Sequence, residues 1–63
     1  MAGTLIASLE GPKGMAEICE VVEPVSSGGQ RFEYEVYNGG EVQRFLTLGE
    51  AYITAKELTG AAG

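Results

Sequence analysis

Three short stretches rich in glycine and proline interrupt the chain, and they set the strictest limit on its fold. They are Gly11-Pro12-Lys13-Gly14, Pro24–Gly29 and Asn38-Gly39-Gly40. Glycine reaches left-handed backbone conformations and proline lacks a backbone N–H, so such stretches are typical of turns. No segment before the third turn is longer than ten residues. The chain is therefore limited to short elements joined by tight turns, followed by one longer segment.

The segments on either side of the third turn predict a β-hairpin over 31–48. Residues 31–37 alternate between polar and apolar, with Phe32, Tyr34 and Val36 on one face. With a two-residue turn, this face lies beside Gln43, Phe45 and Thr47. With a three-residue turn, it lies beside Val42, Arg44, Leu46 and Leu48. We expect the second register because it gathers more apolar side chains, although it places Arg44 on the buried side, at an edge.

The C-terminal segment predicts a helix over 48–59. Thr47-Leu48-Gly49-Glu50 has capping-box spacing, in which Thr47 accepts from the Glu50 N–H and Glu50 reaches back to the Thr47 N–H. Gly60 is a suitable terminator. Apolar residues then recur at helical spacing and predict one buried stripe. The stripe contains Leu48, Ala51, Tyr52, Ala55 and Leu58.

The N-terminal half gives a weaker pattern. Residues 4–9 predict a strand, whereas residues 15–23 fit both a strand and a helix. We expect a strand over 15–23, because the segment is short and the turn after it resembles a loop between antiparallel neighbours. The helix stays open as the alternative. The expected fold is α+β: a small antiparallel meander of three or four strands with one C-terminal α-helix packed on one face.

The length of the chain predicts one small domain over 1–63 with a marginal core, because a chain of this size buries only about 60% of its unfolded surface. Small domains usually add disulfides, a metal or a partner subunit. Cys19 is the single cysteine and there is no histidine, so neither an internal disulfide nor a structural zinc site is expected. Association with a second copy or another protein is the remaining way to stabilise the small core.

The residue types present argue against an enzyme. All nine acidic residues are glutamate, and there is no histidine to activate Cys19. The nearby carboxylates of Glu17, Glu20 and Glu23 would raise the pKa of its thiol. Glu33 and Glu35 share a strand face, but one small sheet and one helix offer no cleft for acid–base chemistry on a sugar. No calcium loop or phosphate-binding loop has the required spacing. We therefore expect no catalysis, no metal and no cofactor.

The run Phe45-Leu46-Thr47-Leu48-Gly49-Glu50-Ala51 leads from a strand into a capped helix. Over 30–60, this arrangement resembles the general layout of arm-type DNA-binding domains, a three-stranded sheet followed by a helix. Members of that group use a basic sheet face to neutralise phosphates. Here the corresponding face is expected to hold Glu33, Glu35 and Glu41 against Arg31. The resemblance therefore implies a fold only, and we expect no direct binding to nucleic acid.

The outer sheet face is the expected contact surface. In the expected register, Tyr37 and Phe45 point away from the helix and supply the apolar contact, because aromatic side chains provide much of the energy of interfaces. Glu33, Glu35 and Arg31 form the polar rim. The sequence thus predicts a non-enzymatic acidic interaction module that binds a protein partner or itself, as a homodimer.

The net charge of −5 supports a second hypothesis, a nucleic-acid mimic. Small acidic phage proteins that block host nucleases are similar in size and charge, and rows of glutamate imitate a phosphate backbone. Such an inhibitor would bind a basic host protein that handles nucleic acid. The apolar start of the chain, which ends at Glu10, is too short for a signal or a membrane span. We expect a cytoplasmic protein, in the host cytoplasm if it is viral, with no membrane partner.

Overall fold

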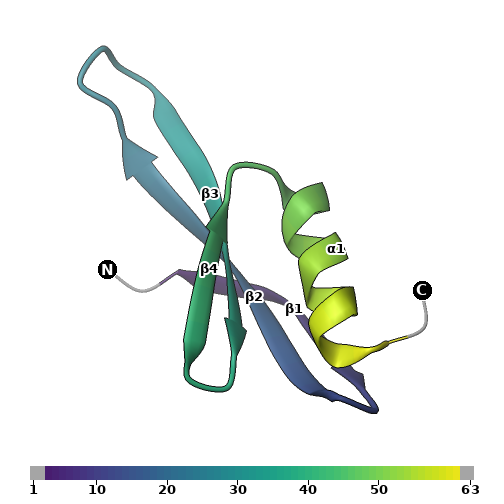
Figure 1. Ribbon diagram of the computed structural model, residues 1–63. Helices are drawn as coiled ribbons and strands as arrows, with labels where there is room; N and C mark the ends of the chain where they lie inside the picture. The colour runs from purple at the N-terminus through teal and green to yellow at the C-terminus, as the bar shows by residue number, and fades with distance from the viewer. Residues whose placement is uncertain (1–2, 62–63) are drawn as a thin grey trace.

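The computed structural model describes residues 3–61, which form a four-stranded antiparallel sheet with one helix on one face (Figure 1). The strands lie in chain order, so the sheet is a simple meander. They are β1 (Thr4–Gly11), β2 (Gly14–Pro24), β3 (Gln30–Asn38) and β4 (Glu41–Phe45), and the helix is α1 (Leu48–Thr59). The predicted α+β meander is confirmed, and the open choice over 15–23 is decided in favour of a strand.

Successive side chains of each strand point to opposite faces of the sheet, so the sheet has a covered face and an open face. On the covered face, which packs against α1, Ile18 of β2 lies opposite Val36 of β3. On the open face, Cys19 lies opposite Glu35 in the neighbouring pair. The two names are used below in this sense.

The core lies between the covered face and α1. Ile18, Val36, Ala51 and Ala55 are almost completely buried there. The helix contributes small side chains to this layer, which lets its backbone lie close to the strands. Leu9 and Ala16 complete the buried cluster, and Tyr34, Phe45 and Leu58 pack around it partly buried.

Both ends of α1 are capped. The Thr47 hydroxyl accepts from the Glu50 N–H at 3.2 Å, as predicted, but the Glu50 carboxylate accepts from that same hydroxyl at 3.1 Å. At the other end, Gly60 adopts a left-handed conformation with φ 72° and donates its N–H to the Lys56 carbonyl at 2.8 Å. The Lys13 N–H donates to the Thr59 carbonyl at 2.9 Å, which ties the end of α1 to the first turn.

The predicted apolar stripe of α1 is only partly correct. Ala51 and Ala55 are buried, and Leu58 packs at the edge of the core, but Leu48 and Tyr52 remain exposed. The core is therefore smaller than the stripe implied.

The predicted hairpin register is wrong. Asn38 pairs with Glu41 across the two-residue turn Gly39-Gly40, and Tyr34 pairs with Phe45. Gly39 has φ 63°, the positive value that II′ hairpin turns require at their first central position. The expected register depended on Leu46 and Leu48 as strand residues.

Because β4 ends at Phe45, those two leucines belong to the turn and the helix and do not count toward its face. The two-residue register instead places Phe45 beside the core and keeps Arg44 off the covered face. It also moves Glu41 to the covered side of the sheet, where it does not join Glu33 and Glu35. Burying an apolar ring in place of a guanidinium is the favourable choice, since an unpaired buried charge is costly.

The hairpin of β2 and β3 extends past both of its neighbours (Figure 1). The β1 pairing stops at Glu20 and the β4 pairing stops at Tyr34, whereas β2 and β3 continue to pair as far as Pro24 and Gln30. Residues 21–33 therefore form a projecting two-stranded arm. The arm makes the molecule elongated, with extents of 43 × 21 × 15 Å.

Candidate interaction surface on the open face

Four of the five predicted contact residues share the open face, and one does not. Arg31, Glu33, Glu35 and Tyr37 alternate along β3 and all point to the open side. Phe45 lies on the covered face, where it packs against the core. The prediction that Tyr37 and Phe45 share a surface is therefore wrong, for the same reason as the register.

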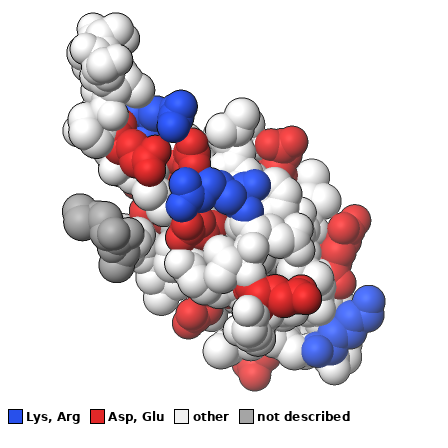
Figure 2. Space-filling view, turned by 60° about the vertical axis from the view of Figure 1, so that its left-hand side comes forward, with Lys and Arg blue, Asp and Glu red and all other residues white. Residues whose placement is uncertain are grey.

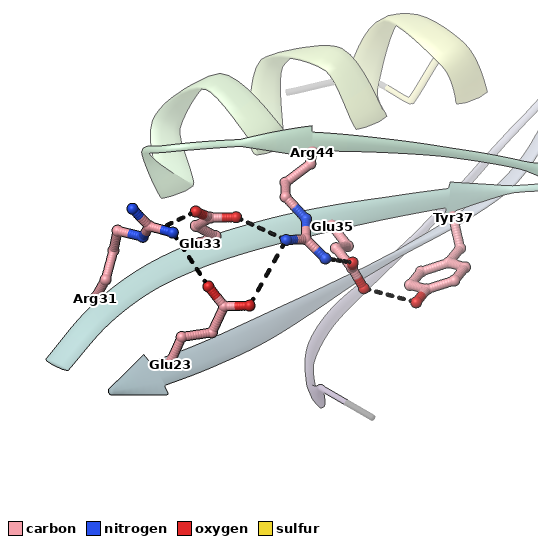
Figure 3. Close-up of polar contacts among 6 residues, drawn as sticks. All are labelled: Glu23, Arg31, Glu33, Glu35, Tyr37 and Arg44. Atoms are coloured by element: carbon pink, nitrogen blue, oxygen red, sulfur yellow. Dashed lines mark hydrogen bonds and ion pairs between the residues drawn. The ribbon is translucent and has the colours of Figure 1, made fainter. Parts of the chain in front are cut away.

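A chain of ion pairs crosses the open face near the base of the arm (Figure 3). Glu33 lies at its centre: one carboxylate oxygen is 3.1 Å from Arg31 Nε and the other is 2.9 Å from Arg44 Nη1. Glu23 of β2 lies 3.3 Å from Arg31 and 4.0 Å from Arg44. Three strands thus contribute charged groups to one network.

The network continues to Glu35 and ends at an aromatic hydroxyl. Glu35 accepts a hydrogen bond from Arg44 and a second one, at 2.7 Å, from the Tyr37 hydroxyl. These two bonds lower the pKa of Glu35, because both stabilise the carboxylate. The same contact raises the pKa of Tyr37, since the phenol donates to a negative charge.

The charges of the network are largely compensated. Three glutamates face two arginines, and basic side chains at the base of the arm lie directly against acidic ones (Figure 2). Glu33 is only 7% exposed, although both of its arginine partners reach solvent. The carboxylates of the network, Glu23, Glu33 and Glu35, therefore do not form a row of free negative charges.

An apolar patch adjoins the network on the side away from the arm. Tyr37 pairs with Val42 of β4, and Met15 of β2 is its diagonal neighbour, because Glu17 lies directly opposite Tyr37. All three side chains are exposed. Met15, Tyr37 and Val42 are called the open-face patch below.

Sequence reasoning missed three residues of this surface. Arg44 was expected on the buried side, and neither Val42 nor Met15 was proposed as a contact residue. The rejected two-residue register contained the signal for two of them, because it places Val42 and Arg44 together with Tyr37 and Glu35. The signal for Met15 lay in the strand expected over 15–23, because alternation along that strand decides the face on which Met15 lies.

Cys19 also lies on the open face, half buried between the strands that hold Leu5 and Glu35. Burial raises the pKa of its thiol, and the nearby carboxylates of Glu17 and Glu35 raise it further. The direction agrees with the expectation from sequence, with burial as the largest cause. A thiol whose pKa is raised holds its proton and is a poor nucleophile at neutral pH.

Residues 3–61 contain no detected pocket and no group of three acidic or cysteine side chains arranged to hold a metal ion. The one helix in this part of the chain is too short to span a membrane. Comparison of the chain with protein-family models, curated proteins and solved structures gives no match.

Proposed function

We propose that the chain is a non-enzymatic protein-interaction module that binds a partner protein through its open face. The observation that carries this proposal is the position of the open-face patch, an exposed aromatic and two aliphatic side chains next to a network of paired charges. Tyrosine is enriched among the residues that dominate binding energy, and methionine adapts its shape to a partner. This patch supplies the apolar centre of the contact.

The ion pairs provide the rim. A partner that covers unpaired charges must remove their water, whereas Glu33 and Glu35 already accept hydrogen bonds from arginine. Arg31 and Arg44 remain partly solvent-accessible and have donors to spare for a partner. The surface therefore suits a protein with an apolar spot flanked by mixed polar groups.

The alternative, mimicry of nucleic acid, gains less from this geometry. A mimic needs free carboxylates at phosphate-like spacing, and the two glutamates proposed for that role are paired with arginine. The two hypotheses differ in salt dependence. Binding through an apolar patch changes little with salt, whereas binding of carboxylate rows to a basic channel weakens steeply.

The test compares a Tyr37→Ser, Val42→Ser double variant with an Ile53→Ser control, because Ile53 is exposed on the outer side of α1, away from the open face. Proteins enriched from the source cells by the wild-type chain are purified and titrated against all three chains. We expect the double variant to bind at least about tenfold more weakly, and the control to bind like wild type. Equal affinities for the double variant and wild type would rule out the open face.

A further inference from the structure

We infer that a second copy of this chain docks against the covered side of the molecule, with the arm of each copy packed on α1 of the other. This surface is separate from the open face and does not depend on the function proposed for it. Three features support this dimer: the arm, one side of α1 and the distribution of charge.

The arm exposes an apolar pair that residues 3–61 do not cover. Val22 and Phe32 lie opposite one another on the covered side of the sheet, beyond the buried cluster, and Phe32 is 46% exposed. No strand of the described chain flanks the arm at this level. A two-stranded ribbon is marginally stable by itself in water, so a cover over this pair would stabilise the arm.

Helix α1 presents a matching apolar side. Leu48 and Tyr52 are one helical turn apart, and Tyr52 is 47% exposed. They lie on the same side of the sheet as Val22 and Phe32. A two-fold axis that places the arm of the first copy on α1 of the second also places the arm of the second on α1 of the first. The same contact therefore forms twice, as in isologous dimers.

The charge distribution favours this contact between two acidic chains. Each copy has a net charge of −5, so an interface between copies must keep carboxylates apart. The tip of the arm, residues 24–30, has no charged residue. On the covered side of β2, Glu20 is the next side chain after Val22, and its carboxylate accepts a hydrogen bond from the Tyr34 hydroxyl at 3.4 Å. Glu50 and Glu57 lie seven residues apart on one side of α1, whereas Leu48 and Tyr52 lie on the other.

The elongated chain exposes more surface than a compact monomer of its mass. A standard interface takes about 800 Å² from each partner, about a fifth of the 4228 Å² that this chain exposes. A compact monomer of this mass would expose about 3,900 Å² and have a radius of gyration of about 10.6 Å, below the 12.4 Å of this chain. The arm accounts for the difference in shape, and docking would cover the part of the chain that projects.

Sedimentation equilibrium of the full chain tests the proposal. We expect a mass of twice 6.6 kDa for the wild type, and at least about a tenfold rise in the dissociation constant for Phe32→Ser and for Tyr52→Ser. Ile53→Ser should remain dimeric, as should the Tyr37→Ser, Val42→Ser variant of the open face. A 6.6 kDa wild type, or dissociation caused only by the open-face variant, would overturn the proposal.

Cross-linking gives a second readout, because a covalent product traps even a dimer that the substitutions have weakened. In a Cys19→Ser background, chains with Val22→Cys are mixed with chains with Tyr52→Cys and treated with a short bismaleimide. Because each chain then has one thiol, every linked product joins two copies. We expect linked dimers from this pair and few from Val22→Cys mixed with Ile53→Cys; equal yields would contradict the predicted contact.

Discussion

Glu33 is the residue that connects the acidic composition of the chain to its sheet. Its carboxylate is nearly buried, and each of its oxygens faces a different arginine. A buried carboxylate without such partners would lose its hydration with no compensation. Glu33 therefore contributes to the folded structure as well as to the acidic charge that keeps the chain soluble.

Replacing Glu33 with glutamine tests this role. Glu33→Gln removes both ion pairs and keeps the size of the side chain, so we expect the free energy of unfolding to fall by about 1 kcal/mol. Glu57→Gln is the control, because Glu57 is exposed on α1. Its effect should stay within about 0.5 kcal/mol. Urea titrations measure both, and equal effects would show that the network contributes nothing specific.

Glu35 predicts how stability depends on pH. The hydrogen bonds from Tyr37 and Arg44 lower the pKa of Glu35 in the folded chain, so the unfolded chain binds a proton at higher pH than the folded one. The contribution of Glu35 is complete above the unfolded value of about 4.3 and is lost as the pH falls through the folded value.

Urea midpoints from about pH 6 down to about pH 2.5 should therefore fall less for Glu35→Gln than for the wild type. Tyr37→Phe should reduce the fall by a smaller amount, because it removes one of the two hydrogen bonds. Parallel curves for all three chains would contradict the assigned contacts.

At the scale of elements, the contact between the first turn and the end of α1 depends on the absence of a side chain at Gly11. A Cβ there would lie 2.4 Å from the Thr59 carbonyl oxygen and 2.7 Å from the Ala61 backbone nitrogen. Backbone atoms cannot move aside easily, so this close approach requires glycine.

Gly11→Ala should therefore lower the free energy of unfolding by about 1–3 kcal/mol. Gly49→Ala is the matched substitution, since Gly49 lies in the first turn of α1 with open space around its Cβ position. It should raise the free energy of unfolding by about 0.5–1 kcal/mol through better helix propensity. Thermal or urea unfolding that gives both changes the same sign would contradict this account.

The elements themselves could be predicted from local sequence, because turns, caps and alternation are local signals. The strand over 31–37, the helix over 48–59 and its caps at Thr47 and Gly60 agree with the structure. The pairing of β3 with β4 could not be predicted by counting apolar residues. It depends on where β4 stops and on where Arg44 finds partners, and both are tertiary properties.

The wrong pairing of β3 with β4 misplaced one residue of the candidate surface. Arg31, Glu33, Glu35 and Tyr37 were placed correctly on one face because alternation along a single strand is sufficient. Phe45 required the register between two strands, and it lies on the covered face instead.

At the scale of the whole molecule, the chain buries little and exposes much. Within residues 3–61, eleven large apolar side chains are exposed, whereas the buried ones of comparable size are Leu9, Ile18, Val21 and Val36. The exposed ones lie on both faces: the open-face patch on one side, and Val22, Phe32, Leu48 and Tyr52 on the other. Seven of the eleven therefore belong to the two surfaces proposed above.

Photo-cross-linking at position 37 tests the central claim, that the open face meets a protein partner, most directly. Tyr37→p-benzoylphenylalanine keeps an aromatic ring at the centre of the open-face patch, and the same replacement at Ile53 is the control. Irradiated source cells should give a covalent adduct of defined mass from position 37, heavier than two copies of this chain, and none from position 53. Adducts from position 53 alone, or no adduct from position 37, would contradict the claim.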